Sequence, residues 1–155
     1  MGLILLVEDE PGAVTLIRRY IESSSFEHKL AAFAKAAEAF SYASKNKVDL
    51  FILDIQLLDY RGTELARQLR SMPEYRFTPI LFTTELAGEE LSAYREIKCY
   101  DFLVKPFTEA GFQRTFQAAL EMGAQMQAAP EILRIEQKQF LFEYEIGRAS
   151  CRERV

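Results

Sequence analysis

The chain has 155 residues, 49% of them hydrophobic, and a formal net charge of −4 at pH 7. This length suits one domain plus a shorter segment, and the acidic balance gives no general attraction to nucleic acid or to anionic membranes. The apolar run from Leu3 has no basic leader and is too short for a membrane span, which predicts a first strand rather than a signal peptide. Cys99 and Cys151 suggest neither a disulfide framework nor a metal-binding spacing, so we expect a cytoplasmic protein.

Short apolar runs then alternate with amphipathic stretches along the chain. The predicted strands are Leu3–Val7, His28–Ala34, Leu50–Leu53, Pro79–Thr84 and Asp101–Val104. The first predicted helix begins at about Pro11, and the others cover Ala34–Asn46, Gly62–Met72, Gly88–Ile97 and Glu109–Gln127. Five strands, each followed by a helix over a short connection, predict an α/β fold, a doubly wound five-stranded parallel sheet with helices on both faces.

Polar residues stand at the ends of four predicted strands. They are Glu8 and Asp9 after the first strand, Asp54 after the third, Thr83 and Thr84 at the end of the fourth, and Lys105 with Pro106 after the fifth. Ligands of such sheets bind at the carboxyl ends of the strands. Three carboxylates gathered there would repel one another, and Mg²⁺ prefers oxygen ligands of this kind. We therefore expect Mg²⁺ and Lys105 to compensate the charge of Asp54.

Each of these features taken alone has an ordinary explanation. An acidic pair after a strand is often a solvated loop, a strand-end aspartate often caps a helix, and paired threonines suit a strand. What favours a functional site is that all of them occur together, in order, at the same end of four strands.

The chain from residue 1 to about residue 122 resembles the receiver domain of two-component response regulators, which has a flavodoxin-like fold. The matching segments are LLVEDE, LFILDIQLLDYRG, PILFTTE and DFLVKPF. In addition, Thr84 follows Asp54 by thirty residues and Gly62 follows it by eight. The resemblance implies that Asp54 accepts a phosphoryl group from a sensor histidine kinase.

The resemblance also implies roles for the neighbouring residues. Mg²⁺ would be held by Glu8, Asp9, Asp54 and the backbone carbonyl of Gln56. Lys105, ahead of a cis bond to Pro106, would contact the phosphoryl oxygens, and Thr84 with Phe102 would form the switch pair. The chain would then not be an enzyme beyond Mg²⁺-dependent self-phosphorylation and autodephosphorylation, and Mg²⁺ is its only expected cofactor.

Three positions depart from the family pattern. Leu58 stands where proline is frequent, Phe102 replaces the commoner tyrosine, and Glu85 follows Thr84 where a small residue is usual. We expect a freer loop after Asp54, a switch aromatic without a hydroxyl, and an altered lifetime of the phosphorylated state. None of the three changes removes a reacting group.

The C-terminal part is expected to lie outside this domain. Residues 123–131 are predicted to be a linker, and residues 132–145 resemble the first hairpin of a LytTR-type DNA-binding domain, a β-rich effector that is truncated here. Residues 146–155 look like a translated sequencing adapter and are expected to be a non-native tail. On this interpretation the parent protein binds DNA and forms a homodimer when phosphorylated, whereas this chain does not bind DNA specifically.

Three other functions would account for part of this pattern. A stand-alone receiver acting only through protein–protein contacts remains an alternative. A haloacid dehalogenase-like phosphatase needs a second acid two residues after the aspartate, where this chain has Gln56. A flavodoxin-like cofactor binder needs a phosphate loop after the first strand, and the acidic sequence EDEPG would repel a phosphate.

Overall fold

The structure is a computed structural model, and it describes residues 2–85 and 101–128. The described elements are, in chain order, β1 (Gly2–Val7), α1 (Pro11–Glu22), β2 (His28–Phe33), α2 (Ala36–Lys45), β3 (Leu50–Asp54), α3 (Gly62–Arg70), the short 3-10 helix η1 (Pro73–Tyr75), β4 (Ile80–Thr84), β5 (Asp101–Val104) and α5 (Glu109–Ala128). The helix predicted at Gly88–Ile97 lies outside the described residues.

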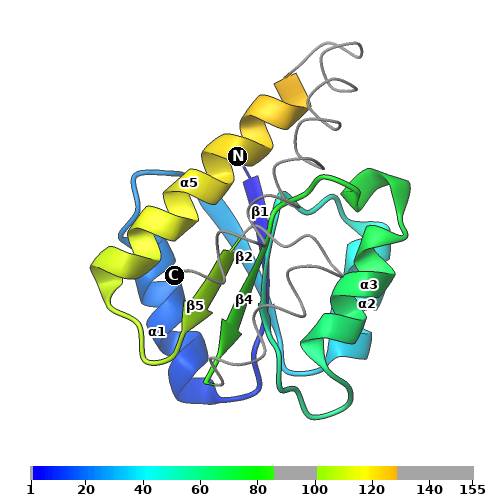
Figure 1. Cartoon of the computed structure of the whole chain (residues 1–155), viewed down its shortest axis with the longest axis horizontal. Helices are drawn as coiled ribbons and strands as arrows, with labels where there is room; N and C mark the ends of the chain where they lie inside the picture. Colours follow the sequence, from blue (N-terminus) through cyan, green and yellow to red (C-terminus); the bar gives the residue numbers. More distant parts are fainter. Residues whose placement is uncertain (1, 86–100, 129–155) are drawn as a thin grey trace, which may run out of the picture.

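All five strands pair in parallel, in the order β2-β1-β3-β4-β5. The strand order changes direction between β1 and β3, so the crevice expected to hold a ligand lies beyond the carboxyl ends of these two strands. The register places Val7 opposite Leu53 and Asp54 opposite Thr83. The predicted doubly wound parallel fold is confirmed (Figure 1).

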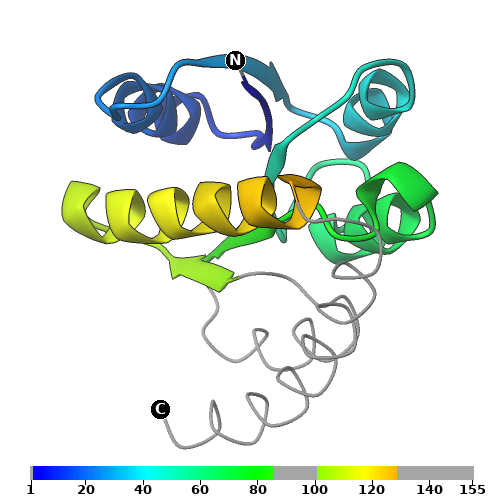
Figure 2. The same cartoon turned by 90° about the horizontal axis from the view of Figure 1, so that it is seen from above.

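Helices cover both faces of the sheet. Figures 1 and 2 show α1 and α5 on one side and α2 and α3 on the other. Strand residues alternate between the two apolar layers, as the pleat requires. The layer under α2 and α3 includes Leu5, Val7, Phe51, Leu53, Leu65, Phe82 and Phe102. The layer under α1 and α5 includes Ile4, Leu6, Ile17, Leu50, Ile52, Leu81, Leu103, Phe112 and Phe116.

Helix α1 begins where the sequence predicts. Pro11 occupies the first turn, where its missing N–H needs no partner. The Glu10 carboxylate accepts hydrogen bonds from the backbone N–H groups of Gly12 at 3.0 Å and Ala13 at 2.6 Å. Ile17 and Ile21 then face the core at helical spacing.

Helix α2 begins at Ala36, two residues later than predicted, because a distant residue caps it. The N-cap residue Lys35 makes no side-chain capping bond. Instead, the Asp59 carboxylate, from the loop after β3, accepts hydrogen bonds from the backbone N–H groups of Ala36 and Ala37, both at 2.9 Å. This contact ties the loop beyond Asp54 to the neighbouring helix.

Helix α5 continues beyond the predicted domain boundary. It ends at Ala128, close to the predicted helix end at Gln127, so residues 123–128 of the predicted linker are helical. Met126 is only 6% exposed, and Gly123 lies against the ring of Pro79. The predicted effector segment 132–145 and tail 146–155 lie outside the described residues. Among the helices of residues 2–85 and 101–128, none combines the length and apolar character needed to cross a membrane.

Candidate functional site

Side chains from three separate segments meet at the carboxyl edge of the sheet. Glu8 follows β1, Asp54 ends β3 and Lys105 follows β5. The Lys105 Nζ atom lies 2.8 Å from Glu8 Oε2 and 3.1 Å from Asp54 Oδ2. The lysine thus bridges two carboxylates that are far apart in the sequence. Its contact with Asp54 agrees with the expectation that Lys105 compensates the charge of Asp54.

Asp9 adds a third carboxylate to this cluster. Carboxylate oxygens of Glu8, Asp9 and Asp54 all lie within 4.8 Å of one another. Glu8 is 2% exposed and Asp54 is 6% exposed, whereas Asp9 is half-buried. A set of oxygen donors with this net negative charge suits a hard divalent cation such as Mg²⁺.

The electrostatics of the cluster follow from burial and crowding. Burial raises the pKa of Glu8 from its ordinary 4.5 to about 7; the hydrogen bond from Lys105 opposes this rise, and the charge of Asp54 adds to it. Burial lowers the pKa of Lys105, but the hydrogen bonds and charges of Glu8 and Asp54 outweigh this and raise it overall. Lys105 therefore stays charged, and one lysine compensates the buried carboxylates only in part.

The loop after β3 holds Asp54 in place from below. The backbone N–H of Gln56 donates to Asp54 Oδ1 at 3.1 Å, and the backbone N–H of Gly62 donates to the carbonyl of Ile55 at 2.8 Å. Leu58, at the tip of this loop, is 70% exposed. The Gln56 side chain is also exposed, and metal binding by its backbone carbonyl stays a prediction.

The end of β4 places two threonines beside this cluster, and both are buried. The backbone carbonyl of Thr84 accepts a hydrogen bond from the N–H of Lys105 at 2.7 Å. The peptide bond from Lys105 to Pro106 is cis, which confirms that prediction. Glu85, which follows Thr84, is exposed.

Phe102, the expected switch aromatic, points into the core. It is buried, and its ring stacks on Phe82 with centroids 5.6 Å apart. Phe82 and Phe102 belong to the layer under α2 and α3. Because side chains alternate along a strand, Thr84 lies on the same face as Phe82. The two residues expected to form the switch pair are therefore on one side of the sheet.

Sequence reasoning gave no role to two residues near this edge. Asp59 caps α2, and the only signal for it is an acidic residue in a loop, which has many ordinary uses. Thr83 is fully buried, and within residues 2–85 and 101–128 its Oγ1 atom has no hydrogen-bond partner. The strand pattern signals only that a threonine fits this position.

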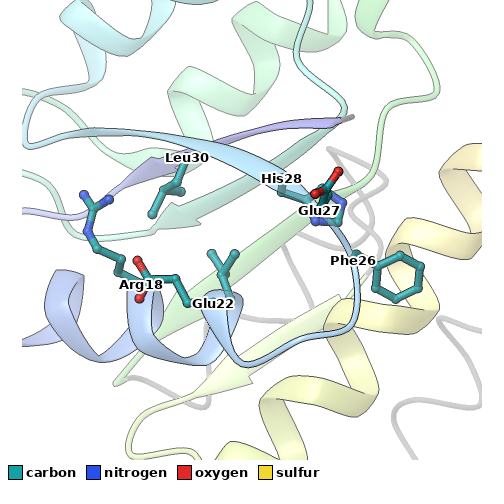
Figure 3. Close-up of a pocket in the computed structure, with 7 residues that line it drawn as sticks. Arg18, Glu22, Phe26, Glu27, His28 and Leu30 are labelled. Atoms are coloured by element: carbon teal, nitrogen blue, oxygen red, sulfur yellow. The ribbon is translucent and has the colours of Figure 1, made fainter.

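A hollow lies at the opposite end of the strands, between α1 and the start of β2 (Figure 3). It is lined by Arg18, Ile21, Glu22, Phe26, Glu27, His28 and Leu30. This hollow is far along β2 from the carboxyl edge that carries Glu8 and Asp54. None of the residues predicted for the site lines it.

Comparison with known proteins identifies the family of this arrangement. The response regulator receiver domain family matches residues 4–124. This range contains every residue assigned to the acidic cluster, the bridging lysine and the expected switch pair.

Two relatives illustrate the range of proteins that carry such a domain. The cyclic di-GMP phosphodiesterase response regulator RpfG of Xanthomonas campestris is 32% identical over 141 residues, covering 89% of this chain and 37% of RpfG. The transcriptional regulatory protein YvrH of Bacillus subtilis is 33% identical over 125 residues, covering 74% of this chain and 51% of YvrH. The match thus spans about a third to a half of these relatives.

Solved structures share this fold. The receiver domain of the sensor histidine kinase PA1611 of Pseudomonas aeruginosa is 28% identical with a TM-score of 0.69, covering 77% of this chain and 98% of that chain. That structure has a magnesium ion coordinated in its active site cleft. The chemotaxis response regulator CheY4 of Vibrio cholerae is 27% identical with a TM-score of 0.69, covering 77% of this chain and 99% of that chain.

Proposed function

The chain belongs to the response regulator receiver domain family, and on that premise we propose that Asp54 is the phosphoacceptor of a two-component phosphorelay. The observation that carries the proposal is the setting of Asp54. It is a buried carboxylate at the carboxyl end of β3, 3.1 Å from the Lys105 ammonium and within a cluster of two further acids. An isolated buried carboxylate is costly, so this arrangement suits a reacting group.

The proposed partner is a sensor histidine kinase. An oxygen of Asp54 forms a bond to phosphorus while the bond from phosphorus to the kinase's histidine nitrogen breaks. The imidazole nitrogen keeps the electron pair, and Asp54 becomes an acyl phosphate. Phosphoryl transfer depends mainly on positioning and on charge stabilisation, which the fixed Asp54 and the charged Lys105 provide.

The acidic cluster fits Mg²⁺, and we assign its binding to Glu8, Asp9, Asp54 and the backbone carbonyl of Gln56. The fit rests on three carboxylates within 4.8 Å that are only partly compensated by one lysine. When bound, Mg²⁺ would neutralise charge on the incoming phosphoryl oxygens. Glu8 has a further role, because its hydrogen bond at 2.8 Å holds the Lys105 ammonium beside Asp54.

Signal output is proposed to pass through Thr84 and Phe102. Phosphorylation adds about −1.5 to −2 charges and three acceptor oxygens, which gives the Thr84 hydroxyl a new partner. Thr84 shares one face of the sheet with Phe82, on which the Phe102 ring is stacked. A shift of Thr84 towards Asp54 would therefore vacate space beside that ring.

The output activity depends on parts of the protein beyond the receiver domain. We propose a transcription-regulating output, with DNA binding in the full-length parent and a homodimer in the phosphorylated state. The transcription-regulating output is supported by the names of relatives such as YvrH and the phosphate regulon transcriptional regulatory protein PhoB of Rhizobium meliloti. RpfG is named a phosphodiesterase, so receiver similarity alone is compatible with other outputs, including a stand-alone receiver.

Incubation with acetyl phosphate tests the phosphoacceptor directly. With Mg²⁺ present, intact-mass spectrometry should show one added phosphoryl group that hydroxylamine removes. Asp54→Asn should abolish it, because an amide cannot form the acyl phosphate. Labelling of Asp54→Asn to the wild-type extent would contradict the assignment.

Two further variants separate uptake from signalling. Thr84→Ala should still take up the phosphoryl group, because its hydroxyl is not the nucleophile, but should not respond to it at the ring of Phe102. Lys105→Met should reduce phosphorylation, because it removes the positive charge next to Asp54. NMR of the Phe102 ring, with and without acetyl phosphate, distinguishes the two effects.

A further inference from the structure

The hydroxyl of Thr83 is an unused polar group in the interior. Thr83 is 0% exposed, and its Oγ1 atom is buried without a hydrogen-bond partner in the part of the chain that the structure describes. Valine has the same shape and suits a strand equally well, and it would avoid the free-energy cost of an unpaired hydroxyl. A buried polar atom of this kind calls for an explanation.

The sheet register places Thr83 next to Asp54. The two residues are opposite one another on neighbouring strands, and the N–H of Ile55 donates to the Thr83 carbonyl at 3.1 Å. This backbone hydrogen bond fixes the position of Thr83 along β4 relative to Asp54, the proposed phosphoacceptor.

The alternation of side chains puts both residues on one face. Leu81 and Ile52, each two residues earlier on its strand, belong to the apolar layer under α1 and α5. Thr83 and Asp54 therefore also lie on that face. Thr84 lies on the opposite face, with Phe82.

Lys105 follows β5, the strand that lies on the other side of Thr83 from β3. Thr83 is opposite Leu103 on β5, and Lys105 follows Leu103 by two residues. The Thr83 side chain thus lies between the strand that carries Asp54 and the strand that leads to Lys105. A phosphoryl group on Asp54 that contacts Lys105 would lie on the face of the sheet that carries the Thr83 side chain.

Resting on the proposed phosphorylation of Asp54, we propose that the Thr83 hydroxyl donates a hydrogen bond to the phosphoryl group and prolongs the life of the acyl phosphate. The phosphoryl group brings three acceptor oxygens to a donor that has no acceptor among the described residues. Hydrolysis passes through a loose, metaphosphate-like transition state. In such a transition state negative charge moves from the phosphoryl oxygens to the departing carboxylate. A hydrogen-bond donor to those oxygens therefore stabilises the phosphorylated ground state more than it stabilises the transition state.

The test compares hydrolysis rates in variants that keep the shape of the side chain. The chain is phosphorylated with acetyl phosphate and Mg²⁺, the donor is removed, and the decay of the phosphorylated form is followed by intact-mass spectrometry. Thr83→Val should shorten the half-life about threefold to tenfold, the size of one hydrogen bond, and Thr83→Ser should stay within about twofold of wild type. Thr78→Val, a buried threonine just before β4, is the matched control and should leave the half-life unchanged.

A measurement on the wild-type chain does not depend on how the variants fold. Methyl NMR of threonine follows Thr83 and Thr78 as beryllium fluoride, which mimics a phosphoryl group, is added with Mg²⁺. The Thr83 methyl signal, assigned by its loss in Thr83→Ser, should shift, while that of Thr78 stays.

The possible results separate this proposal from the proposed function. If the wild-type chain takes up no phosphoryl group, the phosphoacceptor function fails, and the role of Thr83 fails with it. If wild type and Thr83→Val are both labelled and decay at the same rate, Asp54 stands and the role of Thr83 is wrong. An unmoved Thr83 methyl signal in a chain that binds beryllium fluoride also overturns it.

Discussion

Gly62 packs directly against the backbone carbonyl of Asp54. A Cβ atom built on Gly62 would overlap the Asp54 carbonyl oxygen and crowd the Cα of Ile55. The reason is close approach rather than an unusual backbone angle, because the described chain has no glycine with positive φ. The start of α3 is thereby held against the strand end that carries the proposed phosphoacceptor.

Replacing Gly62 with alanine should therefore destabilise the protein. The added methyl meets backbone atoms that cannot rotate away, and overpacking of this kind costs about 1–3 kcal/mol. Urea denaturation monitored by circular dichroism should show a lower midpoint for Gly62→Ala. Gly111→Ala, early in α5, is the control: its Cβ meets only the Thr108 hydroxyl at 3.2 Å, and alanine favours a helix. Equal midpoints for the two variants would contradict the close packing.

The acidic cluster predicts opposite effects of one substitution in the absence and presence of metal. Asp9→Asn removes one of three neighbouring negative charges, so the metal-free protein should unfold at a higher temperature than wild type. It should also lose the stabilisation by Mg²⁺, which for wild type is about 1.4 kcal/mol at ten times the Kd. Thermal unfolding with EDTA and with Mg²⁺ measures both effects.

Glu10→Gln is the matched control for Asp9→Asn. Glu10 is the next residue, but its carboxylate caps α1 and is not part of the cluster. The Glu10→Gln variant should keep the stabilisation by Mg²⁺. A metal response that survives in Asp9→Asn and disappears in Glu10→Gln would place the ion elsewhere.

The cap that Asp59 provides for α2 predicts a dependence on pH. Burial raises the pKa of Asp59, but hydrogen bonds from the backbone N–H groups of Ala37, Ala36, Tyr60 and Asp59 together outweigh this and lower it below its ordinary 3.8. The folded state thus holds the proton less tightly than the unfolded state. The stabilisation is fully present above the ordinary pKa and is lost as the pH falls through the lowered value.

Asp59→Ala should accordingly lower the urea midpoint at pH 7, and the difference from wild type should shrink as the pH falls below the ordinary pKa of 3.8. Asp59→Asn keeps one acceptor oxygen and should lie between the two. A difference that stays constant from pH 7 to pH 2 would show that the charge of Asp59 contributes nothing.

The sequence allowed the fold and the acidic edge to be predicted because both depend on simple periodic rules. Parallel strands bring their carboxyl ends to one edge, so Asp54 and Lys105 could be placed together without knowing any loop. The cap from Asp59 could not be predicted, because it depends on how the loop after β3 folds back towards α2. The same holds for the start of α2 at Ala36, which follows from that cap.

Burial of individual polar atoms was equally out of reach. The hydroxyl of Tyr75 bonds the backbone of Val48 and Ala43, which joins η1 to the end of α2 and the start of β3. The sequence shows a tyrosine two residues after a proline, and this pattern is also typical of exposed turns. The unpaired hydroxyl of Thr83 likewise appears only when the packing around it is known.

The C-terminal boundary of the domain leads to the last prediction. The family match ends at residue 124 and α5 ends at Ala128, whereas the sequence suggested a boundary near residue 122. Truncation after Met122 would remove Met126, which is 6% exposed, and the contact of Gly123 with Pro79. Losing one buried methionine side chain costs about 2 kcal/mol or more. The chain cut after Met122 should therefore unfold at a lower urea concentration than the chain cut after Ala128.

A phosphorylation assay shows whether the chain that ends with α5 keeps the proposed function. The chain cut after Ala128 should take up one phosphoryl group from acetyl phosphate at the wild-type rate, because Asp54, Lys105 and the acidic cluster are all retained. If this chain matches wild type in both stability and labelling, the receiver domain ends with α5. If the cut after Met122 is equally stable, the last turns of α5 do not belong to the folded domain, and the boundary near residue 122 is right.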